Sequence, residues 1–407
     1  MIGPRKSHLL FSLSKGGLLS KEPSHFSRWQ QEKAAFPVAQ KSIYLANSAT
    51  TPLRREVFDA MQFYLSELTE KGELPWGEVL ASLEPTRTSI AKSYGGQGDD
   101  YGFGANTSHN MNLLALAMKT GSSKKNAIVS LEGEFPSTVT PWKYQGYHIR
   151  TSPLLPSGEQ TVDRILSLCS EETAAVVVSH VQFANGYRLP LKRLGQTLKE
   201  KKIPLIVNAT QSFSCFSFNV EQLPISAMTV SSHKWLGALY GCSLLYVNPE
   251  LRASLRWPMA GHMSFNDPTF SGDMSHPHAG TRFIELGTPP FPQWIAFSAA
   301  WEQVQRIGLT SIEERVLSLS NHVVSLAAKN NFTLSSLRDQ DSFHPDSINS
   351  AIVALKVSRP KETVVALKKK GVVVTERRGA LRIAPHYFND EEEIEKLFFY
   401  LSNMQSC

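Results

Sequence analysis

Short apolar runs alternate with amphipathic segments along most of the chain. Between about residues 42 and 250, these runs are rich in valine, isoleucine and leucine, and the segments between them have helical periodicity. Continuous apolar runs separated by helices are typical of a mainly parallel sheet covered by helices. The strands that we expect there lie at 127–131, 174–179, 204–208, 227–231 and 243–247.

The pattern changes near residue 292. Long amphipathic segments between about 294 and 329 predict helices, and the segments that follow mix both periodicities. The chain is therefore predicted to be an α/β protein, with a large sheet domain over 42–291 and a smaller α+β domain over 292–407. The other elements expected are a strand and turn at 42–52, a helix to about Leu68, strands at 348–357, 371–375 and 381–384, and helices near 361–370 and from Asp390.

Residues 1–41 precede the first expected strand and are predicted to form an N-terminal arm. The first 21 residues contain Arg5, Lys6, Lys15 and Lys21 but no acidic residue. Such a segment is either a loosely ordered arm, which we favour, or a weak organelle-targeting segment. A secretory signal is disfavoured because Lys15 interrupts the apolar stretch.

Composition narrows the class of protein. With 407 residues, 42% hydrophobic and 19% charged, the chain suits a globular protein with two cores. No apolar run reaches the length of about 18 residues that a membrane span needs, so no membrane partner is expected. The net charge of +6 is spread along the chain, which argues against nucleic-acid binding. Four scattered cysteines argue against disulfides and a structural metal site, and suit the reducing cytoplasm.

One lysine stands in an informative setting. Lys234 lies in a turn between two apolar runs, directly after Ser231, Ser232 and His233. A lysine that forms a Schiff base needs a rigid position, partial desolvation to lower its pKa, and nearby donors for an anionic cofactor. On this segment alone, an ordinary lysine in a turn remains an equal alternative.

Other polar residues follow strands or begin a helix. Asn208 ends one expected strand and His180 follows another, and ligands of parallel sheets bind at the carboxyl ends of strands. Thr107 and Ser108 come just before the helical run 111–118, where free amides and hydroxyls form an anion site. A simple helix cap is the alternative interpretation.

Taken together, these segments resemble the class V aminotransferase and cysteine desulfurase superfamily, which are fold type I pyridoxal-phosphate enzymes. The resemblance covers roughly residues 42–400, and is closest to the isopenicillin-N-epimerase-like and selenocysteine-lyase-like branches. It implies a mainly parallel sheet of the seven-stranded type, pyridoxal 5′-phosphate as cofactor, and a homodimer with a shared active site. The segments that carry it, in chain order, are 44–52, 104–110, 134–137, 179–186, 205–211, 229–247, 283–289 and 376–386.

The resemblance also implies roles for single residues. Lys234 would be the catalytic lysine that holds the cofactor, and Arg382 would bind the substrate α-carboxylate through its guanidinium fork. Thr288 would reach the cofactor phosphate of the partner subunit. The remaining cofactor contacts are the phosphate group Thr107, Ser108 and His109, the stacking ring of Phe135, the phenolic-oxygen donors Gln182 and Gln211, the ring-nitrogen partner Asn208, and the donors Ser231 and His233.

Two departures from the family pattern matter. Asn208 stands where the family usually has an aspartate that pairs with the protonated pyridine nitrogen. An opposite charge shifts a neighbour's pKa by about 1–3 units, roughly 1.4–4 kcal/mol, and an amide supplies no such charge. Three interpretations stay open: an active enzyme with a weaker electron sink, a degenerate homologue, or an introduced substitution that inactivates the protein. In addition, only three residues separate Arg378 from Arg382, which leaves no room for the desulfurase cysteine loop.

We therefore expect a pyridoxal-phosphate enzyme that acts at the α-carbon of a small amino-acid substrate, with Lys234 as general base. Transamination, epimerisation and β-elimination are all compatible with the sequence, and Asn208 favours β-elimination slightly. Desulfuration by the usual persulfide route is disfavoured. The alternatives are a non-catalytic or weakened cofactor-binding homologue and, less favoured, a basic nucleic-acid-binding protein.

Overall fold

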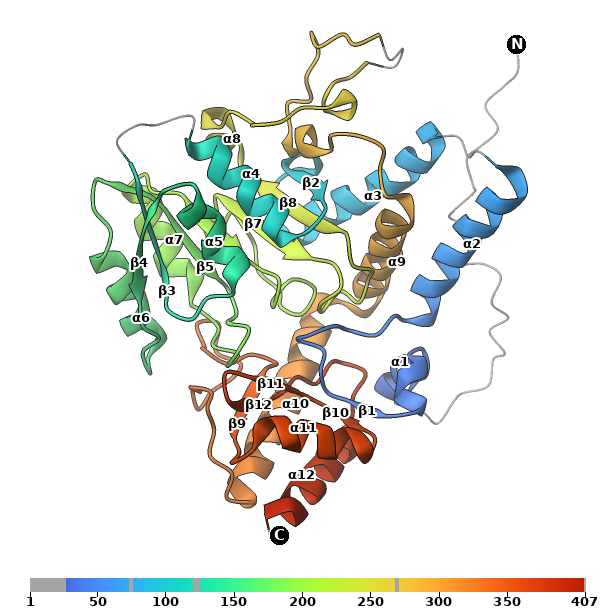
Figure 1. Cartoon of the computed structure of the whole chain (residues 1–407), viewed down its shortest axis with the longest axis vertical. Helices are drawn as coiled ribbons and strands as arrows, with labels where there is room; N and C mark the ends of the chain where they lie inside the picture. Colours follow the sequence, from blue (N-terminus) through green and yellow to red (C-terminus); the bar gives the residue numbers. More distant parts are fainter. Residues whose placement is uncertain (1–26, 73–75, 120–124, 268–270, 406–407) are drawn as a thin grey trace.

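The structure is a computed structural model that describes residues 27–72, 76–119, 125–267 and 271–405. A large sheet with its helices forms one part of the molecule, and a smaller C-terminal part lies against one end of it (Figure 1). Because residues 1–26 lie outside the described residues, the expected arm or targeting segment at the N-terminus stays a prediction.

The large sheet has seven strands, and most of them run parallel. Strand β8 is antiparallel to both of its neighbours, whereas the strands from β7 to β4 are parallel throughout. This confirms the predicted α/β class with a mainly parallel sheet. In spatial order the strands are β2 (Tyr101–Gly104), β8 (Ser243–Val247), β7 (Ala227–Ser231), β6 (Leu205–Asn208), β5 (Thr173–Ser179), β3 (Ala127–Leu131) and β4 (His148–Ser152).

Two of these strands, β2 and β4, were not expected from the sequence. Strand β4 is polar and largely solvent-accessible, because it forms an edge of the sheet. Strand β2 contains two glycines, a residue that is depleted in strands. A Cβ atom on Gly102 would lie 2.5 Å from the Thr281 carbonyl oxygen, so close packing against the 3-10 helix Thr281–Ile284 explains this glycine.

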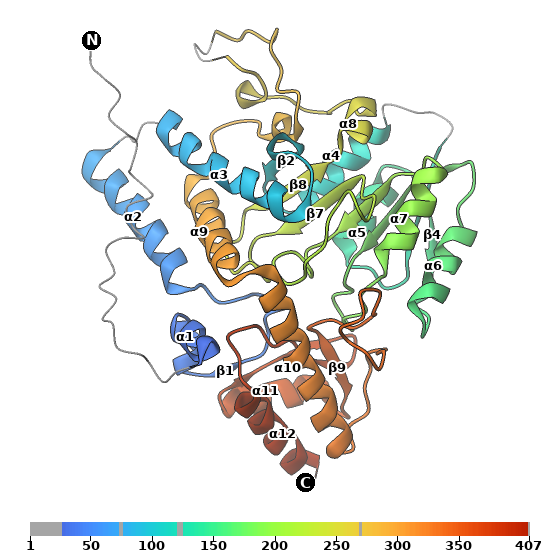
Figure 2. The ribbon, with the colours of Figure 1, turned by 180° about the vertical axis from the view of Figure 1, so that it is seen from behind.

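Helices cover both faces of the large sheet (Figures 1 and 2). Apolar side chains of α4 and α5 pack on one face, and those of α3, α6, α7 and α9 pack on the other. Helix α2 packs against α9 at the edge of this layer. The helices are α2 (Arg55–Lys71), α3 (Trp76–Tyr94), α4 (Thr107–Lys119), α5 (Pro136–Tyr144), α6 (Gly158–Ser167), α7 (Leu191–Glu200), α8 (Pro249–Ser254) and α9 (Phe291–Ile307).

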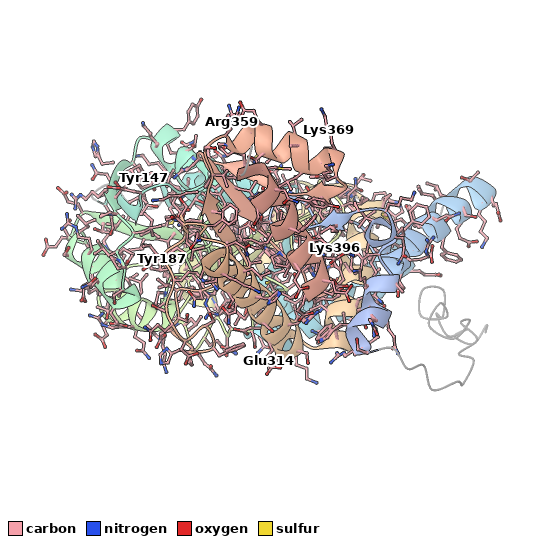
Figure 3. The ribbon with its side chains drawn as sticks, turned by 90° about the horizontal axis from the view of Figure 1, so that it is seen from below. Tyr147, Tyr187, Glu314, Arg359, Lys369 and Lys396 are labelled. Carbon is pink, nitrogen blue, oxygen red and sulfur yellow. The ribbon has the colours of Figure 1, made fainter. Side chains whose placement is uncertain are left out.

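The smaller part has its own sheet and apolar core. Three antiparallel strands follow the order β11-β12-β9, and a short parallel pair joins β1 to β10. Figure 3 shows this part from below, with exposed Arg359 and Lys369 at the two ends of α11 and Lys396 on α12. The elements are β1 (Ile43–Tyr44), α10 (Leu309–Lys329), β9 (Val353–Lys356), α11 (Pro360–Lys369), β10 (Val372–Val373), β11 (Thr375–Arg377), β12 (Ala380–Ile383) and α12 (Glu391–Gln405).

Two expected strands of this part differ from the structure. The strand expected at 348–357 is confined to β9, because Ile348 and Ser350 instead bond to the loop after β5. The Arg188 amide donates to the Ile348 carbonyl at 2.8 Å, and the Ser350 hydroxyl donates to the Gly186 carbonyl at 2.6 Å. The strand expected at 371–375 divides into β10, which pairs with β1, and β11, which pairs with β12.

The described end of the expected N-terminal arm is folded onto the molecule. Helix α1 (Arg28–Ala34) is followed by a short 3-10 helix at Pro37–Gln40. Its Lys33 forms ion pairs with Asp390 and Glu393 of the small part, at 2.6 and 2.8 Å. Helix α1 is therefore held against the start of α12.

Candidate active site

A cavity of about 220 Å³ lies between the carboxyl ends of the central strands and the hairpin that joins β11 to β12. Ligands of parallel sheets bind at this edge. Most of the residues predicted for the site line it, and none of the lining residues is acidic. The lining comprises Ser48, Asn106, Thr107, Ser108, Phe135, Ser137, Ser179, Val181, Phe183, Asn208, Thr210, Gln211, Ser231, His233, Lys234, Arg377 and Arg382.

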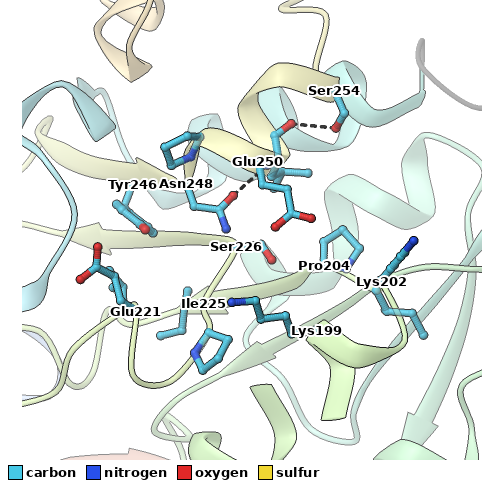
Figure 4. Close-up of a pocket in the computed structure, with 15 residues that line it drawn as sticks. Lys199, Lys202, Pro204, Glu221, Ile225, Ser226, Tyr246, Asn248, Glu250 and Ser254 are labelled. Atoms are coloured by element: carbon cyan, nitrogen blue, oxygen red, sulfur yellow. Dashed lines mark hydrogen bonds between the residues drawn. The ribbon is translucent and has the colours of Figure 1, made fainter. Parts of the chain in front are cut away.

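A larger cavity of about 550 Å³ lies at the opposite ends of the parallel strands, where these strands begin (Figure 4). Pro204 and Ser226 lie there, just before β6 and β7 begin. Exposed Lys199, Glu221 and Glu250 surround it, and the two signs of charge are mixed. None of the predicted site residues belongs to it, so the smaller cavity is the candidate active site.

Lys234 enters the cavity from the turn after β7. Its Nζ donates to the carbonyl oxygens of Ser48 at 3.2 Å and Ala49 at 2.6 Å. Burial, and then the nearby guanidinium groups of Arg382 and Arg377, lower the pKa of Lys234 to about 8. A lysine with such a pKa has a substantial neutral fraction near physiological pH, which a nucleophilic amine requires.

The turn that carries this lysine is held tightly. The Ser232 hydroxyl bonds to the carbonyl oxygens of Leu239 and Cys242, the latter at 2.7 Å. The Gly237 amide donates to the Lys234 carbonyl at 2.8 Å, and Gly237 has a φ of 69°. Glycine accepts this conformation without strain, so the backbone below the lysine is fixed.

Hydroxyl groups gather beside the N-terminus of α4. The Thr107 Oγ1 atom lies 2.8 Å from the Ser231 Oγ atom and 3.0 Å from the Thr210 Oγ1 atom. Ser108, in the first turn of α4, also lines the cavity and is exposed. A helix N-terminus with several hydroxyls is suited to a phosphate group. The structure therefore brings Thr107, Ser108 and Ser231 together as one anion cradle.

Two predicted histidines lie near this cradle. His109 is half-buried but does not line the cavity, and burial lowers its pKa. His233 lines the cavity and stacks on Tyr240, with ring centroids 4.4 Å apart. Burial and the adjacent charge of Lys234 lower the pKa of His233 to about 4, so its ring is neutral at physiological pH.

Asn208 ends β6 and has both ends of its amide engaged. Its Nδ2 donates to the Thr138 Oγ1 at 2.9 Å, and its Oδ1 accepts from the Thr210 amide at 3.1 Å. Glu134 lies nearby and accepts from the Ser179 amide at 2.6 Å. Burial raises the pKa of Glu134 although these donors oppose the shift. The buried Glu134 carboxyl therefore belongs to the same polar cluster as Asn208, and Thr138 links the two side chains.

The two predicted glutamines are placed differently. Gln182 is buried outside the cavity lining, and its Nε2 donates to Glu134 at 2.8 Å. Gln211 lines the cavity, where its Nε2 donates to the Ser48 carbonyl at 2.9 Å. Its Oε1 accepts from the Trp235 indole at 2.8 Å. The Gln182 side chain is thus assigned to the buried polar cluster, whereas Gln211 belongs to the wall of the cavity.

An aromatic pair lines another side of the cavity. Phe135 is 46% exposed, which leaves part of its ring free to cover a flat ligand. Phe183 meets it edge to face, with ring centroids 5.1 Å apart. Sequence analysis did not find Phe183, since a phenylalanine in a loop carries no distinctive signal.

Arg382 lies on β12 and is almost fully buried. Its Nε donates to the Thr375 Oγ1 at 3.1 Å, and its Nη1 donates to the Phe183 carbonyl. Its Nη2 is buried and has no hydrogen-bond partner. Burial and the charge of Arg377 lower the pKa of Arg382 to about 9. An unpaired buried guanidinium nitrogen is costly and is available to a carboxylate.

The hairpin between β11 and β12 has a turn of only two residues. Arg377 pairs with Ala380, so only Arg378 and Gly379 form the turn. Both have positive φ, 53° and 76°, as a two-residue type I′ turn requires. A mobile loop that carries a nucleophilic cysteine therefore has no place before Arg382.

The described cysteines do not line the cavity either. Cys169, Cys215 and Cys242 are free, and none belongs to the lining. Burial raises the pKa of Cys169 to about 11 and that of Cys215 well above its usual value. Because the thiolate is the nucleophilic form, these thiols are poor nucleophiles. Within the described ranges, no group of three or more His, Cys, Asp or Glu residues could hold a metal ion.

Thr288 is exposed and lies outside the cavity lining. The structure thus does not bring it together with the other predicted residues of the same chain.

None of the helices over the described residues is long and apolar enough to cross a membrane.

Eight lining residues were missed by sequence analysis. Arg377 lies two residues from Thr375, the cross-strand partner of Arg382, and this register comes from the structure. Side chains two apart on a strand share a face, so the hairpin pairing places both guanidiniums on the cavity side. The others besides Phe183 gave no pattern of their own in the sequence, and they are Ser48, Asn106, Ser137, Ser179, Val181 and Thr210.

The residues present fit a small anionic aldehyde such as pyridoxal phosphate. A lysine with a lowered pKa faces the cavity, hydroxyls surround a helix N-terminus, and the Arg382 guanidinium has an unpaired nitrogen. Thr107, Ser108 and Ser231 would hold the phosphate, and Phe135 would cover the ring. The fit is weaker at Asn208, where a neutral amide replaces a charge.

Comparisons with known proteins agree with this architecture. A model of the aminotransferase class-V family matches residues 43–397. The uncharacterized aminotransferase YcbU of Bacillus subtilis (strain 168) is 27% identical over 367 residues, covering 90% of this chain and 95% of that protein. A probable cysteine desulfurase of Pyrococcus abyssi (strain GE5 / Orsay) is 25% identical over 387 residues, covering 90% and 95% respectively.

A solved structure shares the fold. The apo cysteine desulfurase of Thermococcus onnurineus NA1 superimposes with a TM-score of 0.80 at 20% identity, and the match covers 93% of this chain and 98% of that one. The α/β architecture is that of fold type I pyridoxal-phosphate enzymes. Since the family model spans most of its length, the chain belongs to the aminotransferase class-V family.

Proposed function

We propose that this protein is a pyridoxal-phosphate-dependent enzyme that acts at the α-carbon of an amino acid. The observation that carries the proposal is the pairing, in one cavity, of Lys234 at a pKa of about 8 with the unpaired guanidinium nitrogen of Arg382. When bound, the cofactor supplies an electron-withdrawing ring that stabilises negative charge at the substrate α-carbon. The family membership supports the same chemistry.

The roles of the chain's own residues follow from their positions. The Lys234 amine would hold the cofactor, and in its free form it would take the proton from the substrate α-carbon. Arg382 binds the α-carboxylate through its guanidinium fork, because a carboxylate matches that geometry and satisfies the buried nitrogen. The hydroxyls at the start of α4 fix the phosphate. Phe135 covers the cofactor ring.

Asn208 decides which outcomes are favoured. A neutral amide cannot stabilise a protonated ring nitrogen by charge as a carboxylate does, so the bound ring would be a weaker electron sink. Reactions that consume the negative charge quickly, such as β-elimination, therefore fit better than transamination or epimerisation, which need a longer-lived charge. Persulfide-forming desulfuration is the least favoured route, because the hairpin turn at 378–379 has no cysteine loop.

A second candidate function rests on the same residue. A non-catalytic or weakened homologue would bind the cofactor through Lys234 and the hydroxyl cradle, yet turn over no amino acid, because the charge at position 208 is absent. The two proposals agree on cofactor binding and differ only in the fate of the α-carbon proton.

We also propose that the protein is a homodimer with a shared active site. The exposed position of Thr288, outside the cavity of its own chain, leaves its side chain free for the cofactor phosphate of a partner subunit. Light scattering during gel filtration is expected to give twice the chain mass of 45.2 kDa. A monomer with full cofactor affinity would contradict the shared site.

Exchange of the α-carbon proton tests the main proposal without assuming a reaction type. The protein is loaded with pyridoxal phosphate and incubated with single L-amino acids in heavy water, and loss of the α-proton signal is followed by NMR. We expect at least one class of amino acid to exchange faster than with free cofactor. Bound cofactor without enhanced exchange would establish the non-catalytic homologue, and failure to bind the cofactor would overturn both proposals.

A further inference from the structure

The cavity contains positive charge that nothing in the described chain balances. Lys234, Arg377 and Arg382 all line it, while its lining contains no aspartate or glutamate. Within the described ranges, neither arginine forms an ion pair with a carboxylate, and the Arg377 guanidinium donates only to the Glu376 carbonyl, at 2.6 Å. Burial, and then the like charge of Arg377, lower the pKa of Arg382 to about 9.

The other buried arginines of the described residues each have a carboxylate partner. Of the four that are buried within the described residues, three pair with a carboxylate: Arg54 with Glu32, Arg87 with Glu285 and Arg188 with Glu313. Arg382 is the exception. Because a buried guanidinium without a partner is strongly unfavourable, an exception at a cavity points to an anion that comes from outside.

The position of Arg377 makes it a second anion site and not a duplicate of the first. It ends β11 two residues after Thr375, the cross-strand partner of Arg382, so both guanidiniums lie on one face of the hairpin as diagonal neighbours. Diagonal neighbours lie roughly 7–8 Å apart at their backbones, which suits two separate anionic groups on one small molecule. The hydroxyl cradle for phosphate belongs to α4 and β7, and thus to other elements.

We propose that the substrate is an amino acid with an anionic side chain, such as an acidic amino acid. Arg382 binds the α-carboxylate, and Arg377 binds the carboxylate of the side chain. This assignment rests on the proposed function, since it concerns the same cavity. The side-chain carboxylate supplies the counter-charge that Arg377 lacks and relieves the repulsion between the two guanidiniums.

Acid and amide pairs of nearly equal shape test the assignment. Glutamate and glutamine, then aspartate and asparagine, are titrated into the cofactor-loaded protein, and binding is followed by the visible absorbance of the cofactor. Glutarate, which has no amino group, is titrated by calorimetry as a readout that needs no reaction. Because a charge-assisted bond is lost, we expect Arg377→Gln to weaken the acids and glutarate about 10- to 100-fold. The amides and alanine should change by less than about 3-fold.

A matched control lies next to the tested residue. Arg378 is exposed and rests on the Phe183 ring at 5.3 Å, but it does not line the cavity. Arg378→Gln removes the same charge from the same hairpin, and we expect the acid-to-amide ratio to remain unchanged. Arg377→Glu should reverse the preference and favour amino acids with a basic side chain.

Three results would overturn the inference. They are equal binding of acid and amide by the wild-type protein, equal weakening of alanine and glutamate in Arg377→Gln, and the same loss of preference in Arg378→Gln. The second result would mean that both guanidiniums bind the α-carboxylate. In each case the cofactor still binds Lys234, so the proposed function survives. If the cofactor itself does not bind, the proposed function fails first, and calorimetry with glutarate still reports on Arg377.

Discussion

Two walls of the cavity differ in whether their polar groups are paired within the protein. The large-domain wall, formed by Thr107, Asn208, Thr210 and Ser231, consists of neutral groups that bond to one another. The small-domain wall, formed by Arg377 and Arg382, carries guanidinium charges without a carboxylate partner. The polar groups of the first wall bond to one another, whereas we propose that the second wall binds an anion.

The difference indicates that the two walls have separate roles. Hydroxyls and amides at strand ends and at a helix N-terminus can hold a cofactor permanently, because their positions are set by the sheet. Unpaired charges on a two-residue hairpin attract and orient a ligand that comes and goes. Lys234 lies between the walls, and its lowered pKa results from burial and from the charges of the small-domain wall.

Replacing Lys234 should remove covalent attachment of the cofactor altogether. In the wild-type protein, borohydride should fix the cofactor to the peptide that contains Lys234, which mass spectrometry identifies. Lys234→Ala should show no fixed cofactor, while Lys199→Ala, in the larger cavity, should behave as wild type. Labelling of another lysine with equal yield would place the chemistry elsewhere.

Restoring charge at the large-domain wall should increase the rate. Asn208→Asp is expected to speed α-proton exchange by about 10- to 1,000-fold, since an opposite charge shifts a neighbour's pKa by about 1–3 units. Asn208→Ala serves as the control and should be slower than wild type. If Asn208→Asp leaves the rate unchanged while the cofactor stays bound, the amide is not the partner of the cofactor ring.

Changing the buried arginine should weaken every amino acid alike. Arg382→Lys keeps the charge but loses the planar fork, so we expect binding about 10- to 100-fold weaker for acidic and neutral substrates together. The cofactor's visible absorbance measures this in the same titrations. An effect confined to acidic amino acids would exchange the roles assigned to Arg382 and Arg377.

The smallest expected effect is on pH dependence. The Lys234 amine must be neutral to attack the cofactor, so the rate of cofactor capture should rise with pH through about 8 and then level off. Arg377→Gln removes a positive neighbour, which stabilises the charged amine and should raise the midpoint by less than about one unit. A midpoint that falls in this variant would contradict the electrostatic coupling between the hairpin and the lysine.

Sequence patterns predicted the bounds of a strand correctly where all of its residues are buried. Strands β3, β7 and β8 lie at the expected bounds because they are buried along their whole length. The polar edge strand β4 and the glycine-containing β2 escaped detection, because tertiary pairing overrides their weak local preference. The strand expected at 348–357 failed at its first half, where a remote loop takes the backbone hydrogen bonds.

The candidate site was predictable as far as it follows motifs. Lys234, the hydroxyl cradle and Arg382 fall into one cavity, as a collinear set of segments would imply. Arg377 was missed because its role depends on strand register, which a single sequence states only weakly. Gln182 was predicted to face the cofactor, but its amide binds Glu134, a partner 48 residues away in the chain.

The most direct test of the two-wall account is a crystal structure of the protein grown with pyridoxal phosphate and glutarate. The account predicts continuous density from Lys234 to the cofactor, with its phosphate at the start of α4 and its ring under Phe135. It also predicts one glutarate carboxylate on Arg382 and the other on Arg377. A phosphate on the two arginines, or a glutarate bound outside the hairpin wall, would contradict it.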